Sequence, residues 1–471
     1  MSGLRLAVLL VALVAAAVPS HASPSCLSPF ALIGGLSVSA MDNLIADPGF
    51  EEGKSGAPAA WETWVPRAEI APAFGLDRRT RRSGRSAARI RCRLPEQIGA
   101  WRQRCQGIEG GAVYRFTGHF RTEGVGSARE SVWVKLGWLD ASGSLVAKDY
   151  VSESAPAGRW TRSQGDVPAP AGAMAVEVTL GLQWCEGAVW WDDISLERCG
   201  PRPARRVRVS TVCYTPPSPS TPEKNLAFFA EKVDQAGRQR ADIICLGEAI
   251  TLVGTNRKLV EVAEPIPGPS TWALGEMARR NRLWIVAGLF EREERRVYNT
   301  AVLIDRMGRL AGRYRKTHLP DTEVSGGITP GSEYPVFRTD FGTNGIQICY
   351  DNFFPEVARS LALNGAEILF TPIWGDGREE NYDWDIVARA RAIDNAVFFV
   401  ASIYGPRRSL IVDPGGHILA DTNNQEGVIT ADLELDRRRV TPWLSVGGLG
   451  EWKRLYPKER RPSTYRDLTR E

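Results

Sequence analysis

Short segments in which apolar and polar residues alternate fill much of residues 42–199. Clusters of Gly, Pro, Ser and Asp separate these segments, and no long helical pattern occurs between them. Alternation with a period of two is typical of β-strands that bury one face. The clearest segments are 112–119, 131–139, 175–182 and 188–196. The pattern therefore predicts an all-β domain over residues 42–199.

From residue 205 the pattern changes to apolar runs of strand length that alternate with segments of helical spacing. Residues 200–204, Gly-Pro-Arg-Pro-Ala, form a stiff linker before this region. Strands that alternate with helices and carry interposed hairpins predict an α/β domain over residues 205–440, with two sheets between helix layers. We expect helices at 226–236, 270–281, 355–364 and 382–395, and strands at 207–212, 241–247, 283–290, 300–305, 310–316, 345–349, 367–373, 397–403, 409–412 and 417–420.

Three polar residues stand where predicted strands of this second domain end. Glu248 ends one strand, Lys316 ends another, and Cys349 ends a third, directly before a helix that begins near Pro355. A cysteine in that position lies near backbone N–H groups and the positive end of a helix dipole, and both lower a thiol's pKa and favour the reactive thiolate. The alternative for each residue is structural: a buried cysteine, a helix-capping acid and a solvated lysine.

The sequence around these residues resembles the nitrilase, or carbon–nitrogen hydrolase, superfamily. The windows that carry the resemblance are Arg-Lys-Thr-His-Leu-Pro at 315–320, Cys-Tyr-Asp-Asn-Phe-Phe-Pro-Glu at 349–356 and Ala-Arg-Ala-Arg-Ala-Ile-Asp-Asn-Ala at 388–396. That family uses a Glu, a Lys and a Cys in this chain order, each at a strand end. The resemblance covers about residues 205–435 and implies a four-layer αββα sandwich with the triad Glu248, Lys316 and Cys349.

The resemblance implies a role for each of these residues in hydrolysis of an amide. Cys349 attacks the carbonyl carbon as a thiolate. Glu248 takes the thiol proton, returns it to the leaving nitrogen, and then activates water against the thioester. Lys316 and the backbone N–H of Tyr350 stabilise the oxyanion.

Further residues are expected around the same site. The family often has a second glutamate between the lysine and the cysteine, for which Glu323 is the candidate and Glu333 the alternative. The resemblance implies a small-molecule amide substrate, no cofactor and a homo-oligomer; a nitrile substrate is a minor option. Residues expected to contact the substrate or flank its pocket, or else simply to pack, are Tyr350, Asn352, Phe353, Trp374 and Asp376.

Composition excludes several other kinds of protein. The net charge of +4, from 59 basic and 55 acidic residues, is too small to predict a nucleic-acid partner. Only four histidines are present, so a Ser-His-Asp triad is poorly supported. No Cys-x-x-Cys occurs, so a structural zinc site is not predicted. The basic run 78–85 is expected to be a solvated loop, with a site for an acidic polymer as the alternative.

Residues 1–22 have the pattern of a signal peptide. Arg5 supplies the positive charge, and residues 6–18 form an apolar segment too short to span a bilayer comfortably. Ser-His-Ala then fits a cleavage site after Ala22. We therefore expect an exported protein, periplasmic or extracellular, with no membrane span in the mature chain. The alternative is an overlong gene start, because Met41 directly precedes the first domain.

The first domain resembles jelly-roll carbohydrate-binding modules at its start, 43–51, and at its end, 191–196. Nine of the fifteen tryptophans lie in this domain and could stack on sugar rings or fill the core. Calcium is common in such modules, and oxygen ligands are offered by Glu51, Asp192 and Asp193, although their spacing does not require a site.

Two features remain open at this level. Four cysteines of the first domain could form disulfides in an exported protein, namely Cys92, Cys105, Cys185 and Cys199. Residues 441–471 form a C-terminal extension expected to wrap the surface or a partner subunit. The rival function is a secreted carbohydrate-binding protein whose hydrolase-like domain is a non-catalytic scaffold; the presence of all three triad residue types argues against it.

Overall fold

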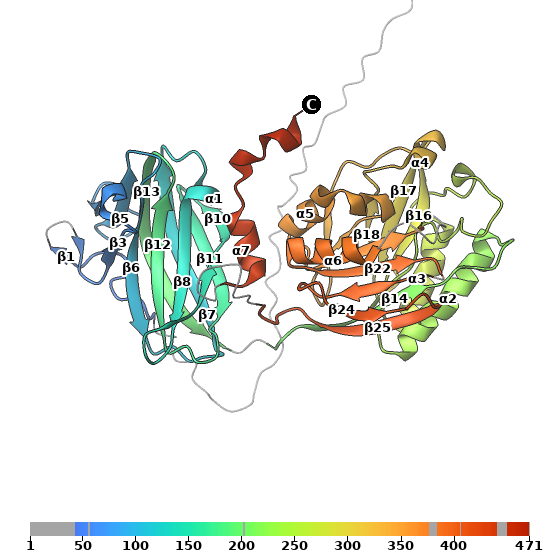
Figure 1. Cartoon of the computed structure of the whole chain (residues 1–471), viewed down its shortest axis with the longest axis horizontal. Coiled ribbons are helices and arrows are strands. Elements are labelled where there is room, and N and C mark those ends of the chain that lie inside the picture. The colour runs from blue at the N-terminus through green and yellow to red at the C-terminus, as the bar shows by residue number, and fades with distance from the viewer. Residues whose placement is uncertain are drawn as a thin grey trace, which may run out of the picture. The chain divides into compact units, whose positions relative to one another are not determined.

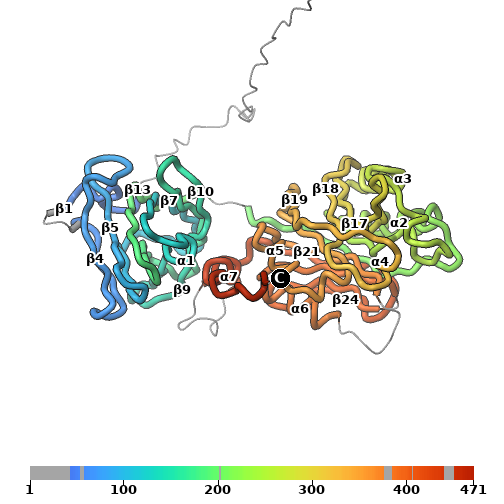
Figure 2. The backbone as a smooth tube through the Cα atoms, turned by 90° about the horizontal axis from the view of Figure 1, so that it is seen from above, coloured from blue at the N-terminus to red at the C-terminus, as the bar shows by residue number. Residues whose placement is uncertain are grey.

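The computed structural model describes residues 43–54, 57–200, 203–375, 384–405, 407–439 and 450–470 (Figures 1 and 2). The expected signal peptide at residues 1–22 and the flanking residue Asp376 lie outside these ranges. The first part of the helix expected at 382–395 also lies outside them; the described helix there is α6 (Trp384–Asn395).

Residues 62–199 form two antiparallel sheets, as the alternating pattern predicted. One sheet has the order β10 (Glu153–Ala157), β11 (Trp160–Pro168), β7 (Val113–Glu123), β13 (Gly187–Cys199), β5 (Ala87–Cys92) and β4 (Ala73–Asp77). The other has the order β3 (Glu62–Trp64), β6 (Ile98–Gln106), β12 (Ala175–Gln183), β8 (Val132–Leu139) and β9 (Leu145–Tyr150). Buried side chains of both sheets make one core, which includes Trp101, Trp138 and Trp191. Most tryptophans of this region are therefore core residues, whereas Trp184 is 50% exposed.

The carboxylates considered for calcium are occupied by protein donors. Glu51 accepts backbone N–H groups of Arg85 and Ser86, and the buried Asp192 accepts those of Arg82 and Ser83. Burial raises the pKa of Asp192 to about 6, although these backbone bonds oppose the rise. Because N–H groups rather than carbonyl oxygens face these carboxylates, the loop does not present an oxygen cage for a cation.

The four cysteines of this region are free thiols in the structure. Cys92 and Cys185 lie in hydrogen-bonding contact, which lowers the pKa of Cys185 to about 7 and, together with burial, raises the pKa of Cys92. Burial raises the pKa of Cys105 to about 12. The disulfides that the sequence allows are thus not formed among these four described cysteines, and the pair found in contact is Cys92 with Cys185.

Residues 206–434 form two further six-stranded sheets. The first sheet has the order β18 (Leu310–Arg315), β17 (Arg296–Ile304), β16 (Trp284–Glu293), β15 (Ile243–Cys245), β14 (Arg206–Cys213) and β25 (Gly427–Glu434). The second has the order β19 (Val336–Arg338), β20 (Thr343–Ile346), β21 (Ile368–Ile373), β22 (Phe398–Ile403), β23 (Leu410–Val412) and β24 (Ile418–Asp421). Within each sheet the central strands are parallel and the outer pairs antiparallel.

The strand period of two sorts each sheet into an inner and an outer face. Ile243 and Cys245 of β15 join the core between the two sheets, whereas Ile244 points to the opposite face. There it packs with apolar residues of α2 (Pro222–Arg238) and α3 (Pro269–Asn281). On the second sheet the outer face is covered by α5 (Pro355–Leu363) and α6. The expected α/β architecture of two sheets between helix layers is confirmed (Figure 1).

Several elements differ from the expectation, and β19, for example, was not predicted. β16 continues to Glu293 and pairs with β17 as a hairpin, so the strand expected at 300–305 begins earlier, at Arg296. β25 was not expected at all; it pairs antiparallel with β14 over its whole length and completes one edge of the first sheet. The pairing of β14 with β25 joins segments that lie more than 200 residues apart in the chain.

Candidate active site

Glu248 lies three residues beyond β15, at the end of the central strands of the first sheet. The backbone here lies very close to β16. The Gly288 N–H donates to the Gly247 carbonyl, and a Cβ on Gly288 would lie 2.6 Å from Glu248 Cα. The next residue, Ala249, has a φ of +51°, a left-handed conformation that costs energy for a residue with a Cβ. The Glu248 side chain is 2% exposed. The backbone around Glu248 is therefore closely packed, and its buried carboxylate is held in a fixed position.

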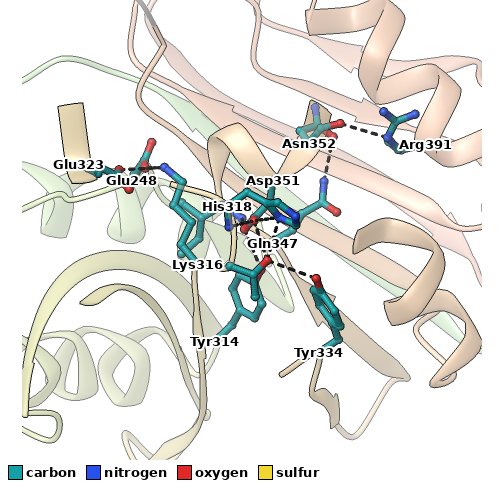
Figure 3. Close-up of polar contacts among 12 residues, drawn as sticks. Glu248, Tyr314, Lys316, His318, Glu323, Tyr334, Gln347, Asp351, Asn352 and Arg391 are labelled. Carbon is teal, nitrogen blue, oxygen red and sulfur yellow. Dashed lines mark hydrogen bonds and ion pairs between the residues drawn. The ribbon is translucent and has the colours of Figure 1, made fainter. Parts of the chain in front are cut away.

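Lys316 directly follows β18 and is 1% exposed. Its Nζ donates to Glu248 Oε1 at 2.9 Å and to Glu323 Oε1 at 2.8 Å (Figure 3). Burial alone would lower the pKa of Lys316, but the attraction of Glu248, Cys349 and Glu323 holds this pKa above its ordinary value. Lys316 is therefore a charged ammonium enclosed by carboxylates, not a solvated strand end.

Glu323 lies on the short helix α4 (Asp321–Ser325) and its side chain is buried. Burial raises the pKa of Glu323, while Lys316 opposes the rise. Its Oε1 is bonded to Lys316, but its Oε2 has no partner among the described residues. The alternative candidate, Glu333, is exposed. Of the two glutamates expected near the lysine, the structure brings Glu323 to it.

Cys349 follows β20 and begins the 3-10 turn η3 (Cys349–Phe353). Its φ is +44°, which is a strained conformation for a cysteine and turns the chain sharply between strand and helix. The thiol lies near the Glu248 carboxylate and the backbone N–H of Trp374, and both act on its pKa. That same N–H donates to Glu248 Oε2 at 2.7 Å. The thiol, the carboxylate and the N–H thus meet at one point.

The expectation of a lowered thiol pKa is wrong. Burial raises the pKa of Cys349 well above its ordinary value, the negative charge of Glu248 raises it further, and Lys316 only partly opposes them. The expected helix is present as α5 from Pro355, but the neighbouring carboxylate of Glu248 and burial outweigh any effect of its dipole on the thiol. With this raised pKa, Cys349 is a protonated thiol at rest, so a neighbouring group must accept the thiol proton before the sulfur can act as a nucleophile.

Asn299 on β17 belongs to the site, although sequence reasoning missed it. Its Nδ2 donates to Glu248 Oε1 at 2.7 Å and to Glu323 Oε1 at 2.8 Å. These are the two oxygens that Lys316 also bonds. In the sequence, the only sign of this role was the presence of an asparagine in an otherwise mainly apolar strand.

Asp351 was also missed, and it connects the lysine segment to the cysteine turn (Figure 3). This fully buried carboxylate accepts from the Tyr314 hydroxyl at 2.7 Å, the Thr317 hydroxyl at 3.0 Å and the backbone N–H groups of His318 at 3.0 Å and Ile348 at 3.1 Å. The His318 ring stacks on Phe354 at 3.8 Å. The residues on both sides of Lys316 and Cys349 are therefore held by one side chain.

The expected substrate contacts have different surroundings. Asn352 is fully buried, accepts from Gln347 through its side chain and from Arg391 through its carbonyl, and so lines no open pocket. Tyr350 and Trp374 are each 37% exposed. Tyr350 precedes the first 3-10 hydrogen bond of η3, from the Asp351 N–H to the Ile348 carbonyl, so its own N–H has no acceptor within that turn.

No group of three or more His, Cys, Asp or Glu side chains among the described residues is placed to hold a metal ion. The polar atoms around Cys349 instead consist of two carboxylates, one ammonium and backbone N–H groups. Such a set can move a proton and stabilise a developing negative charge. The fold and this cluster together define an α/β enzyme with a buried acid–base site beside a cysteine.

Comparison with known proteins identifies the family. A family model named carbon-nitrogen hydrolase matches residues 208–442. A deaminated glutathione amidase of Synechocystis is 35% identical over 237 residues, which cover 45% of this chain and 87% of that protein. An omega-amidase of Mus musculus is 30% identical over 231 residues, covering 45% of this chain and 84% of that protein. A solved carbon-nitrogen hydrolase of Helicobacter pylori, 22% identical, covers 57% of this chain and 99% of its own with a TM-score of 0.50, a likeness of fold.

The chain therefore belongs to the carbon–nitrogen hydrolase family of the nitrilase superfamily. It is an enzyme that hydrolyses carbon–nitrogen bonds other than peptide bonds. Among the described residues, no helix is both long and apolar enough to cross a membrane.

Proposed function

We propose that this protein is an exported thiol hydrolase that cleaves an amide bond of a small molecule through a thioester on Cys349. In the first half-reaction Glu248 Oε2 takes the thiol proton as Sγ attacks the carbonyl carbon. The carbonyl oxygen becomes an oxyanion stabilised by Lys316 and the Tyr350 N–H. Glu248 then gives the proton to the leaving nitrogen, the carbon–nitrogen bond breaks, and ammonia or an amine departs.

The second half-reaction removes the acyl group from Cys349. Glu248 takes a proton from water, whose oxygen attacks the thioester carbon under the same oxyanion donors. The carbon–sulfur bond breaks, the thiol recovers its proton, and a carboxylic acid is released. The raised pKa of Cys349 supports this sequence, because a thiol that is neutral at rest needs an adjacent base to become a nucleophile.

The observation that carries the proposal is the convergence of Glu248, Lys316, Glu323 and Cys349 from four separate segments. Glu323 is proposed to orient Lys316 or the leaving group, because its Oε2 is buried and has no partner among the described residues. The relatives named as amidases support a small amide as the substrate class. The rival scaffold function leaves a buried cation and two buried carboxylates without a purpose.

The test is ammonia release from a panel of small aliphatic amides. Wild type should turn over at least one amide, Cys349→Ala should be folded and inactive, and a matched variant of a buried thiol in the core, Cys245→Ala, should stay active. Iodoacetamide at neutral pH should modify Cys349 before Cys213 or Cys245. Activity that survives Cys349→Ala would refute the thioester route.

Export is proposed from the pattern of residues 1–22. When the full chain is expressed in a bacterium with an intact secretion pathway, the mature protein should begin at Ser23. A product beginning at Met41 in the cytoplasm would instead support an overlong gene start. Light scattering on the same material tests the proposed homo-oligomer.

The N-terminal sheets are proposed to form a jelly-roll domain that binds carbohydrate. The supporting observation is that Trp184 is half exposed, with the Arg461 guanidinium lying over its ring at 5.4 Å. Electrophoresis through gels containing soluble polysaccharides should show retardation of wild type but not of Trp184→Ala. Equal mobility in every gel would remove this assignment.

A further inference from the structure

Asn299 occupies the centre of the charged cluster. It lies on β17, between the strands that lead to Glu248 and Lys316, and is 1% exposed. Each of its two Nδ2 hydrogens is directed at a different glutamate, at 2.7 Å and 2.8 Å. Because both partners are carboxylate oxygens, the amide must turn its nitrogen toward them. Its backbone carbonyl also accepts the Lys316 N–H at 2.8 Å.

The contacts form a closed ring of four polar groups. Glu248 Oε1 and Glu323 Oε1 each accept one bond from Lys316 Nζ and one from Asn299 Nδ2. Two carboxylates face one ammonium, so one negative charge is left over in a buried place, where it is costly. The asparagine supplies two more donors without adding a charge. Burial, together with the repulsion of Glu248, leaves the pKa of Glu323 raised overall, and the Asn299 bond acts against this rise.

We infer that Asn299 is a positioning residue for catalysis, which holds the carboxylates of both glutamates in place against Lys316 through hydrogen bonds that favour their charged form. The inference rests on the proposed function. Asn299 and Lys316 both bond Oε1 of Glu248, so the oxygen left to exchange a proton with Cys349 is Oε2, which accepts the Trp374 N–H. The ammonium has three hydrogens, of which two are used by the glutamates, so the third is available for the substrate oxygen.

A matched control exists within the same domain. Asn344 on β20 is also fully buried, donates through Nδ2 to the Thr339 hydroxyl at 3.2 Å, and, like Asn299, has an Oδ1 without a partner. Among the described residues, its side chain bonds no charged group. Truncation of either asparagine to alanine removes a buried amide from a strand, but only Asn299→Ala removes donors from the glutamates.

The experiment measures how fast iodoacetamide inactivates the enzyme from pH 5 to pH 9, in wild type, Asn299→Ala, Asn299→Asp and Asn344→Ala. Alkylation requires the thiol proton to pass to an ionised glutamate, so the rate falls as the glutamates become protonated. Loss of a hydrogen bond to a buried charge should move this acidic limb upward by about one to two pH units in Asn299→Ala. Asn299→Asp, which keeps the shape but adds a third carboxylate, should shift it at least as far.

The melting temperature is measured on the same samples. Asn344→Ala should melt lower than wild type but keep the wild-type acidic limb. An unshifted limb in both Asn299 variants, with Cys349→Ala inactive toward amides, would overturn the inference and leave the proposed function intact. Amide turnover that survives Cys349→Ala would instead refute the proposed function. A lower melting temperature with an unshifted limb in Asn299→Ala would assign Asn299 a purely structural role.

Discussion

The two oxygens of Glu248 have different partners, and this difference decides what the residue can do. Oε1 is held by Lys316 and Asn299, whereas Oε2 accepts the Trp374 N–H. Because Oε1 already accepts two bonds, Oε2 is the oxygen that we expect to exchange a proton with sulfur. Glu323 has the same kind of held oxygen but no described partner on the other, which suits a residue that bonds the substrate rather than the thiol.

Substitutions of the two glutamates should therefore differ. Glu248→Gln cannot accept a proton, so both acylation and deacylation should fall by about 10²–10⁴-fold in a folded protein. Glu323→Gln keeps a hydrogen-bonding amide and should be milder than Glu323→Ala. Single-turnover acylation with an amide found active in the panel makes the comparison. Wild-type rates in both Glu323 variants would exclude that residue from the site, and full activity in Glu248→Gln would contradict the assignment of the base.

The protonation state of Cys349 gives a pH-dependent test. An ordinary thiol ionises near pH 8.5, but burial raises the pKa of Cys349, so its thiolate should appear only at higher pH. Thiolate absorbs at 240 nm, and the difference between wild type and Cys349→Ala should stay flat as pH rises through 8.5. A difference signal that titrates below neutral pH would show that the resting residue is a thiolate after all.

At the scale of elements, Asp351 joins the end of β18 to the turn after β20. These segments belong to different sheets, and four donors from them converge on one buried carboxylate. The distance between Lys316 and Cys349 therefore depends on a side chain that touches neither of their reacting atoms.

Asp351→Ala should leave these buried donors unsatisfied, at about 1–3 kcal/mol each. We expect the free energy of unfolding in urea to fall by at least about 3 kcal/mol, together with the rate of amide turnover. Asp321→Ala, which removes an exposed carboxylate on α4, should change stability by less than about 0.5 kcal/mol. Equal stability of the two variants would show that the convergence on Asp351 contributes nothing.

The close crossing of β16 and the Glu248 segment offers a second test at this scale. Gly288→Ala places a Cβ 2.6 Å from Glu248 Cα, so the backbone that carries the base must move. Gly427→Ala on β25 of the same sheet meets no atom within 4 Å and serves as the control. We expect turnover to collapse in the first variant and to persist in the second. Normal turnover in Gly288→Ala would mean that the base tolerates displacement.

At the scale of the whole molecule, every residue of the proposed mechanism lies between 248 and 374. Relatives that match about 45% of this chain across most of their own length are named as amidases. Arg205, at the start of the α/β region, forms ion pairs with Glu367 at 2.9 Å and Asp436 at 2.6 Å. The N-terminal end of the α/β region is therefore held by residues of that same region.

A chain of residues 203–471 should consequently turn over small amides at a rate similar to that of the full protein. A chain of residues 214–471 lacks β14, which pairs with both β15 and β25, and should not fold. Circular dichroism and amide turnover are measured on both. A well-folded 203–471 chain without turnover would mean that the N-terminal sheets complete the site.

Local pattern was enough to predict much of this fold. The period of two in segments such as 175–182 is a property of neighbouring residues, and β12 was predicted within one residue of its ends. Helix α3 was likewise expected within one residue, because apolar spacing acts locally. The edge strand β25 was missed, since its stability comes from a partner strand distant in sequence.

The sequence by itself determined that a glutamate, a lysine and a cysteine end three strands in this order, because strand ends follow from local periodicity. Only the tertiary structure decided what surrounds them. Asn299 lies 51 residues from Glu248 in the chain yet bonds it at 2.7 Å, and Asn352, expected to contact substrate, is enclosed by Gln347 and Arg391. The pKa of Cys349 was likewise decided by folding, since burial and the nearby carboxylate exist only once distant segments have closed around the thiol.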